Sequence, residues 1–365
     1  MKNIKYTPLL AGLSFILVAG SAVSAAAQNK GIKDKALAPA SKFDLSHWNI
    51  TLPADFNRDG KVDSISVKDL KKYSHPDFFY LDSQDHMVFV SPNKGARTKN
   101  TSNTRSELRY MLRGTDTRIK THSAENNFAV AAFAKAAAKS RVKFGSVGGK
   151  MEATLKVDHV ALNAGNPNKK PAYSVVVGQI HATKYESTKS GFGYGNEPLK
   201  IYYKKWPGHN TGSVFWNYER NLAKKDKNRT DISYPVWGSA WDSPNDPGAS
   251  GVALGEEFSY TVNVHGNMMY LTFSSPDKPT VKHQINLANN VDAKGQVDEL
   301  DNPYSYGGEL LYFKAGAYNQ CSTKAGSGTW YAGCGGTGNW DIDKANGDYT
   351  QVTFSNLVVG DSTAP

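Results

Sequence analysis

Residues 310–320, Leu-Leu-Tyr-Phe-Lys-Ala-Gly-Ala-Tyr-Asn-Gln, alternate between two kinds of side chain. Successive side chains of a β-strand point to opposite faces of a sheet, so this period of two predicts a strand. Phe313, Ala315 and Ala317 share one face, and the other face carries Tyr312, Lys314, Gly316, Tyr318 and Gln320. We expect a packed back and an open front, on which Gly316 leaves room for a ligand. Ordinary exposed strands also carry Tyr and Lys, so this stretch alone assigns no function.

The same period recurs along the chain and predicts many short strands. The clearest examples are residues 199–206, 213–218, 260–264, 269–273, 281–285 and 349–354. Turns rich in Gly, Pro and Asn separate them. We therefore predict an all-β fold, either an antiparallel sandwich or a jelly roll. The Ala-rich stretch 128–139 stays open between helix and strand.

The first residues have the pattern of an export signal. Lys2 and Lys5 precede an apolar run over residues 9–19, and small residues fill positions 21–27. The run is shorter than the ~20 residues that span a bilayer, which favours a cleaved signal over a membrane anchor. We expect a signal peptide over residues 1–27, a mobile linker over 28–40 and a single domain over 41–365. The protein would then be exported, to the periplasm or outside the cell.

The chain is basic, with 43 Lys+Arg against 33 Asp+Glu and a formal net charge of +10. Residues 1–27 contain two lysines and no acidic residue, so their removal leaves +8. This charge favours a polyanionic partner such as nucleic acid, an anionic membrane or an acidic polysaccharide. Export and the lack of a recognised nucleic-acid-binding motif argue against nucleic acid.

The two cysteines are expected to form a disulfide. Cys321 and Cys334 lie 13 residues apart, and an exported chain meets an oxidising compartment. Closing a loop of this size stabilises a fold by roughly 3 kcal/mol in the chain-entropy model.

An acidic segment near the start of the domain resembles a calcium loop. Asp55, Asn57, Asp59 and Asp63 follow the D-x-N-x-D-G spacing, but Ser66 stands where a bidentate Glu is expected. Two interpretations stay open, a structural Ca²⁺ and an Asx-rich turn. No cofactor is expected to be required for catalysis.

Two further strand motifs place polar side chains on a common face. Alternation puts Arg105, Glu107 and Arg109 together, where two cations held by a carboxylate form a fork for a carboxylate ligand. A solvated charged strand is the ordinary alternative. Gln179 and His181 also share a face, at the end of a Val-rich strand. A hydrogen-bonded core histidine is the usual explanation of one buried His.

Together the three segments resemble the family 7 polysaccharide lyases, the alginate lyases of jelly-roll fold. The family patterns R-[TS]-E-[LV]-R, Q-[IV]-H and Y-F-K-A-G-x-Y-N-Q are matched in that order by residues 105–109, 179–181 and 312–320. The resemblance covers about residues 43–360, and the chain is longer than the compact members. It implies that residues 41–365 are one catalytic domain acting on alginate, an all-β jelly-roll sandwich of two antiparallel sheets with a long concave groove. Neither nucleic acid nor a membrane anchor is expected.

The resemblance implies cleavage of the 1,4-glycosidic bonds of polymannuronate and polyguluronate by β-elimination. The proton on C5 leaves, the oxygen on C4 is expelled, and an unsaturated uronate remains at the new non-reducing end. The C5 proton lies beside a carboxylate whose charge opposes a carbanion, so donors must first neutralise that carboxylate. The resemblance assigns this task to Arg105 and Gln179, with His181 nearby. Tyr318 is the candidate for proton transfer, although a phenol of pKa about 10 needs neighbouring cations to act as a base.

The two uronates require different geometry. In mannuronate the proton and the leaving group are syn, so Tyr318 alone can serve both; in guluronate they are anti, and we expect His181 as base and Tyr318 as acid. Ile180 in the Q-I-H motif resembles members that accept guluronate-containing blocks. We further expect endolytic action by a monomer. Substrate-binding residues are expected to be Glu107, Arg109, Lys200, Tyr202, Lys204, Tyr312, Lys314, Asn319 and Gln320.

Three of those residues, Lys200, Tyr202 and Lys204, rest on strand alternation alone, and a solvated strand face explains them equally well. Two other functional classes also occur on such a fold. A non-catalytic acidic-polysaccharide-binding module can use the same fold and the same basic groove. A jelly-roll glycoside hydrolase needs paired carboxylates, and the nearest match to its E-x-D-x-x-E strand, residues 299–304, ends in Tyr304.

Overall fold

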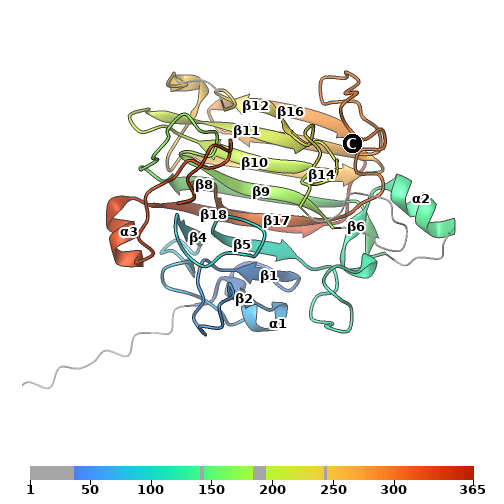
Figure 1. Cartoon of the computed structure of the whole chain (residues 1–365). Coiled ribbons are helices and arrows are strands. Elements are labelled where there is room, and N and C mark those ends of the chain that lie inside the picture. Colours follow the sequence, from blue (N-terminus) through green and yellow to red (C-terminus); the bar gives the residue numbers. More distant parts are fainter. Residues whose placement is uncertain (1–36, 140–143, 184–194, 242–244) are drawn as a thin grey trace, which may run out of the picture. The chain divides into compact units, whose positions relative to one another are not determined.

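Two β-sheets build the part of the chain that the structure, a computed structural model, describes: residues 37–139, 144–183, 195–241 and 245–365. The eleven-stranded sheet runs through β12 (Asp231–Trp237), β11 (Thr211–Glu219), β10 (Leu199–Lys204), β9 (Ser174–Thr183), β17 (Leu310–Asn319), β5 (Arg105–Tyr110), β1 (Trp48–Thr51) and β2 (Ser64–Ile65), with β13 (Val252–Ala253), β6 (Phe128–Ala129) and β7 (Ser146–Val147) paired at its side (Figure 1).

The second sheet has seven strands. It runs through β16 (Lys278–Asn286), β15 (Met268–Ser275), β14 (Glu257–His265), β8 (Gly149–His159), β18 (Tyr349–Gly360), β4 (Met87–Pro92) and β3 (Phe79–Leu81). Among the described strands, only β6 and β7 pair in parallel. The predicted all-β fold of two antiparallel sheets is confirmed, and each stretch of period two coincides with a strand.

Helices are short in the described residues. They are α1 (Val67–Leu70), α2 (Ala131–Lys139) and α3 (Trp340–Asn346), with 3-10 turns at Pro39–Ser41, Ala124–Asn126 and Gly248–Ser250. None of these helices is long and apolar enough to cross a membrane. The stretch 128–139, which the sequence left open, contains both kinds of structure, since the short strand β6 precedes α2.

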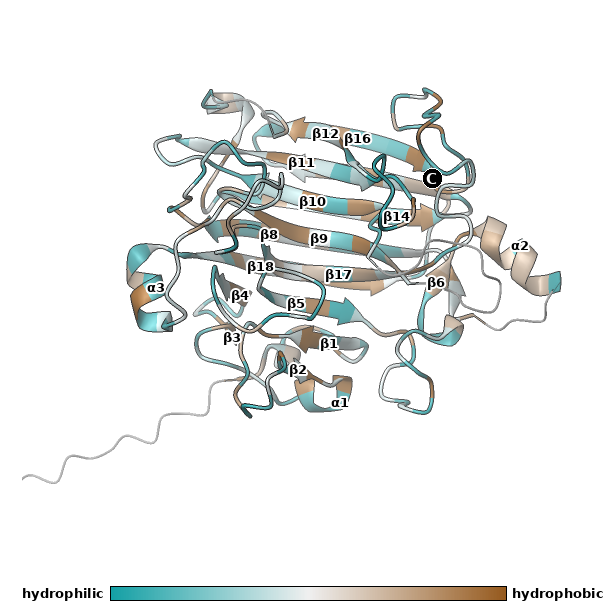
Figure 2. Ribbon diagram, viewed as in Figure 1, coloured by the Kyte–Doolittle hydropathy of each residue, from teal (hydrophilic) through white to brown (hydrophobic). Residues whose placement is uncertain are grey.

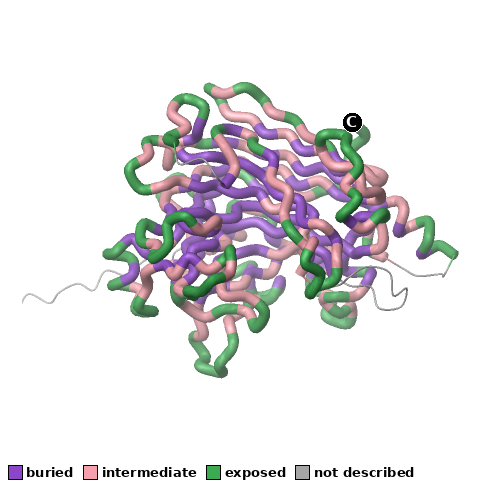
Figure 3. Tube along the Cα trace, turned by 45° about the horizontal axis from the view of Figure 1, so that its top comes forward, coloured by how far each residue is buried: buried purple, intermediate pink, exposed green. Residues whose placement is uncertain are grey.

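Each sheet turns one face to a core that residues of both sheets share. Hydropathy alternates along the strands in Figure 2, and Figure 3 shows buried strands joined by exposed loops. In β10, for example, Ile201 and Tyr203 are buried in this core, whereas Tyr202 joins a separate apolar cluster. The other face of the eleven-stranded sheet is therefore free to carry the polar side chains of the three motifs.

A bulge in β17 explains Gly316. The pairing of β17 with β9 shifts register between Ala315 and Tyr318, and Gly316 has a φ of 139°, which glycine tolerates best. A Cβ at this position would lie 2.5 Å from the backbone oxygen of Ser106 in β5. The expectation that Gly316 leaves room for a ligand is wrong, because its missing side chain lets two neighbouring strands approach each other.

The end of β17 is fixed by one side chain and one disulfide. Asn319 donates from Nδ2 to the Ser91 carbonyl (3.1 Å) and to Oδ1 of Asn93 (2.8 Å), and its own Oδ1 accepts from the Cys321 amide (2.9 Å). Cys321 is bonded to Cys334, which confirms the expected disulfide. The expected substrate contact of Asn319 does not match this placement, because alternation sends its side chain away from the Tyr318 face.

At the end of the expected linker, Pro39 is buried and Ala40 packs against the core. The signal peptide predicted over residues 1–27 and the linker residues 28–36 lie outside the described residues and stay predictions.

Replacing Gly316 by alanine should reduce the free energy of unfolding. The added Cβ meets backbone in a positive-φ conformation, which costs about 1–3 kcal/mol. Gly360→Ala is the matched control, because a Cβ there has no atom within 4 Å. Urea unfolding measures both variants, and equal stabilities would contradict the bulge as the reason for Gly316.

Candidate active site

Four strands bring the predicted motifs into one row across the outer face of the eleven-stranded sheet. Register places Lys314 of β17 opposite both Arg109 of β5 and Gln179 of β9. Gln179 in turn lies opposite Lys200 of β10. Lys314 therefore becomes a direct neighbour of Arg109 and Gln179, each of which is more than 100 positions away in the sequence.

Glu107 is the centre of this cluster and is 2% exposed. Its Oε2 accepts a hydrogen bond from Nη1 of Arg105 (3.0 Å) and forms an ion pair with Nζ of Lys314. Its Oε1 accepts a hydrogen bond from Nε2 of Gln179. Burial opposes ionisation, yet Lys314 and Arg105 hold the pKa of Glu107 below its ordinary value. Glu107 was expected to bind substrate, but its carboxylate already holds three donors and would repel a uronate.

The cluster carries a net positive charge at neutral pH. Burial and the neighbouring Arg105 lower the pKa of Lys314 to about 8, although Glu107 opposes this shift. Below that pH two cations therefore face one carboxylate. Nε of Arg105 and Oε1 of Gln179 are buried and have no hydrogen-bond partner among the residues described, so the cluster is not fully satisfied by the protein.

Tyr318 lies directly against the cluster and is half-buried. The guanidinium of Arg105 is 3.9 Å from the centre of its ring, and Nζ of Lys314 is 5.8 Å away. The hydroxyl is 3.0 Å from Oγ1 of Thr101. The cations next to Tyr318 are thus Arg105 and Lys314, whereas Arg109 lies over Tyr312.

His181 lies on the other side of the row and stacks on Tyr312, with ring centres 5.1 Å apart. Arg109 lies over Tyr312 at 3.9 Å and donates to Oδ1 of Asn127 (3.1 Å). Burial, helped by Lys314 and Arg105, lowers the pKa of His181 to about 4. His181 is therefore a neutral imidazole at neutral pH.

The three residues predicted from the alternation of β10 share one face but are not free. Nζ of Lys200 lies between Glu197 (3.4 Å) and Asp231 (3.3 Å). Tyr202 is 1% exposed and stacks on Phe215 at 5.2 Å. The Lys200 ammonium is therefore already paired with two carboxylates, and the Tyr202 ring is buried.

The third of these residues, Lys204, and the predicted Gln320 also have structural partners. Lys204 is 1% exposed and donates to the backbone oxygen of Lys170 (2.8 Å). Gln320 is buried and donates to the Tyr318 carbonyl (3.2 Å). Gln320 thus supports the backbone of Tyr318.

Two residues near the site were not predicted from the sequence. Glu197 places Oε1 3.6 Å from Nε2 of His181, and Thr101 contacts the Tyr318 hydroxyl. Both precede a strand rather than belonging to one, so period-two alternation says nothing about them. The separation of three residues between Glu197 and the predicted Lys200 was the one sequence signal that could have pointed to Glu197.

The calcium-loop segment adopts the hydrogen bonding of an Asx-rich turn. Asp55 accepts from the backbone amides of Asp59 (3.0 Å) and Gly60 (2.9 Å), and Asp63 accepts from that of Phe56 (2.7 Å). Over the described residues, no three His, Cys, Asp or Glu side chains are arranged to hold a metal ion. A Ca²⁺ bound by Asp55, Asn57, Asp59 and Asp63 stays a prediction without support from this geometry.

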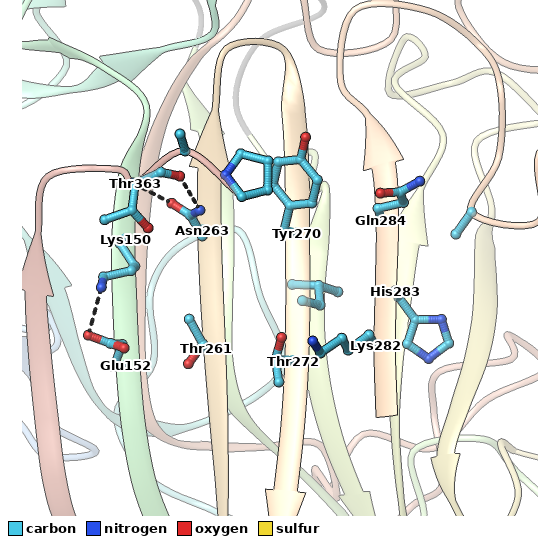
Figure 4. Close-up of a pocket in the computed structure, with 14 residues that line it drawn as sticks. Lys150, Glu152, Thr261, Asn263, Tyr270, Thr272, Lys282, His283, Gln284 and Thr363 are labelled. Carbon is cyan, nitrogen blue, oxygen red and sulfur yellow. Dashed lines mark hydrogen bonds and ion pairs between the residues drawn. The ribbon is translucent and has the colours of Figure 1, made fainter. Parts of the chain in front are cut away.

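A cavity of about 640 Å³ lies elsewhere, on the outer face of the seven-stranded sheet (Figure 4). Side chains of β8, β14, β15 and β16 line it, and its Lys150 is paired with Glu152 (3.2 Å). None of the predicted site residues lines this cavity. It is not the place where the motifs meet.

Replacing His181 by glutamine should flatten the pH dependence of stability between pH 6.5 and about 4. The folded-state pKa is lowered to about 4 from 6.5, so the stabilisation is present above 6.5 and is lost as the pH falls towards 4. The wild type should lose of order 3 kcal/mol more than the variant over this window. Urea unfolding at several pH values measures this, and parallel curves would contradict a buried neutral His181.

The comparisons with known proteins agree with the motifs. The alginate lyase family model (Alginate_lyase2) matches residues 43–361. A curated alginate lyase from Klebsiella pneumoniae is 38% identical over 291 residues, which cover 78% of this chain and 85% of that protein.

Solved structures extend the likeness to the fold. The alginate lyase of Klebsiella pneumoniae superposes with a TM-score of 0.69 at 33% identity, covering 89% of this chain and 99% of that one. An exolytic PL7 alginate lyase from Zobellia galactanivorans gives 0.69 at 34% identity, covering 90% and 99%. A further family 7 alginate lyase, 20% identical with a TM-score of 0.52 over 89% and 99%, shares the fold. The chain therefore belongs to the family 7 polysaccharide lyases and is an alginate lyase of jelly-roll fold.

Proposed function

We propose that this enzyme cleaves alginate by β-elimination at the face formed by β5, β9 and β17. The observation that carries the proposal is the cluster of Arg105, Gln179 and Lys314 around the buried Glu107. With one more cation than carboxylate, it offers a uronate carboxylate both positive charge and hydrogen-bond donors. Neutralising that carboxylate stabilises the enolate that forms when C5 loses its proton. Arg105 and Gln179 are assigned to this task.

Tyr318 is assigned to proton transfer. Its ring centre lies 3.9 Å from the Arg105 guanidinium and 5.8 Å from Nζ of Lys314, so the hydroxyl-bearing ring is next to the cations that face the uronate carboxylate. On mannuronate, Tyr318 removes the C5 proton and returns it to the leaving oxygen on C4. Both events occur on one side of the sugar, so a single group is sufficient.

On guluronate, His181 is assigned as the base and Tyr318 as the acid. Neutral imidazole is the form that can accept a proton, and burial keeps His181 neutral. His181 and Tyr318 lie on neighbouring strands, on the two sides of the Glu107 cluster. We propose that guluronate-containing blocks are accepted for this reason, together with Ile180 in the Q-I-H motif.

The mode of action, the location and the oligomeric state complete the proposal. We propose endolytic action, in contrast to the exolytic relative from Zobellia galactanivorans. Export through the signal peptide over residues 1–27 and a monomeric state are proposed from the sequence alone. Family membership makes an enzyme the better candidate than a glycan-binding module of the same fold.

The proposal is tested with pure polymannuronate and pure polyguluronate. Elimination creates a C4–C5 double bond, whose ultraviolet absorbance gives the rate. Tyr318→Phe should lower kcat by about 100-fold or more on both polymers, because it removes the proton-transfer group. Tyr304→Phe is the control, since Tyr304 is 74% exposed.

Substantial activity in Tyr318→Phe would remove the hydroxyl from the mechanism.

The same reactions report the mode of action. Endolytic cleavage gives a mixture of oligomer sizes and a rapid loss of viscosity early in the reaction. Release of only one short product from the start would refute the endolytic proposal.

A further inference from the structure

Glu197 occupies an unexplained position beside the site. It lies two residues before β10, and its side chain is 15% exposed. The Glu197 amide donates to Oε2 of Glu219 (2.9 Å), and the Glu219 amide donates to the Glu197 carbonyl (3.1 Å). These contacts hold the Glu197 backbone, and Nζ of Lys200, 3.4 Å from Oε2, holds its carboxylate.

That carboxylate faces one nitrogen of His181. Oε1 of Glu197 is 3.6 Å from Nε2. The other ring nitrogen, Nδ1, is 2.8 Å from the Ala182 carbonyl. A carbonyl oxygen only accepts hydrogen bonds, so this contact assigns the proton of the neutral ring to Nδ1. Nε2 then carries the lone pair and is the atom that can take a proton.

The remaining charges around His181 are mostly positive. Among the described residues, Lys314 of β17 and Arg105 of β5 disfavour the imidazolium, Tyr312 of β17 stacks on the ring, and Glu197 is the anion that opposes them. Glu107 already offsets one of these two cations, so a proton on Nε2 would add a second net positive charge to this region. Without a nearby anion, that transfer is uphill.

Glu197 is suited to remain an anion. Despite burial, the neighbouring Lys200 holds the pKa of Glu197 well below its ordinary value. The neighbouring Glu219 has the opposite tendency, because burial and the Glu197 charge raise its pKa. Lys200, which is also paired with Asp231 at 3.3 Å, thus serves to hold Glu197 ionised.

We propose that Glu197 is a positioning residue that acts through His181, as the counter-ion of the imidazolium formed during guluronate cleavage. This inference rests on the proposed role of His181 as base. The C5 proton moves to Nε2, the C5–H electron pair forms the C4–C5 double bond, the C4–O bond breaks, and Tyr318 gives its proton to the leaving oxygen. The proton on Nε2 then faces Glu197 until solvent carries it back to the Tyr318 phenolate.

The two polymers separate this role from a structural one. Mannuronate needs only Tyr318 in the proposed mechanism, so Glu197→Gln should retain kcat on polymannuronate within about twofold. On polyguluronate the same variant should lose about tenfold or more, as expected for impaired general-base catalysis. Glu197→Asp keeps the charge and should recover part of the loss. Glu299→Gln, at an exposed site, is the control.

A pH profile gives the second readout. Removing the anion should lower the pKa of His181, so the acidic limb of kcat/KM on polyguluronate should move to lower pH in Glu197→Gln. Equal losses on both polymers with an unmoved limb would overturn the proposal. So would a Glu197→Gln variant with wild-type activity on polyguluronate.

His181→Gln distinguishes this failure from failure of the proposed function. If His181→Gln selectively abolishes polyguluronate cleavage while Glu197→Gln does not, only the counter-ion role is wrong. If His181→Gln affects both polymers equally, or the wild type does not cleave polyguluronate, the base assignment fails and the counter-ion role falls with it.

Discussion

The buried carboxylate of Glu107 is the interaction on which the site depends. It is almost wholly enclosed and holds Arg105, Lys314 and Gln179 at once. Three long polar side chains would otherwise have many rotamers, and ordering them would cost conformational entropy at every binding event. One carboxylate orders all three in advance and still leaves the cluster positive. Its removal would strand two buried cations, which is costly in any protein interior.

The fold is arranged so that this contact can form. β17 lies between β5 and β9, and the bulge at Gly316 brings its backbone close to Ser106, next to Glu107. Beyond the bulge, Asn319 and the disulfide at Cys321 tie down the end of the strand and with it Tyr318. A second carboxylate, Glu197, sits on the opposite side of the row beside His181. The two acids thus serve different groups, one ordering the cations and one facing the imidazole.

Sequence periodicity predicted a large part of this arrangement. Alternation located the strands and correctly grouped Arg105 with Glu107, because side-chain direction in a strand is a local property. Alternation also placed Asn319 on the face opposite Tyr318, so its structural role was within reach. The sequence did not predict which residues are neighbours across strands, since the order of β9, β17 and β5 depends on packing of the whole sandwich. Gly316 was misjudged for the same reason: the backbone that it accommodates belongs to another strand.

The most direct test of this account is a crystal structure of the Tyr318→Phe variant with a bound oligo-uronate. The proposed mechanism predicts a uronate carboxylate within hydrogen-bond distance of Arg105 and Gln179. It also predicts that Glu107 keeps its contacts with Arg105 and Lys314 and does not touch the sugar. A uronate carboxylate bound away from Arg105 and Gln179, or a Glu107 that turns to contact the substrate, would contradict the central claim.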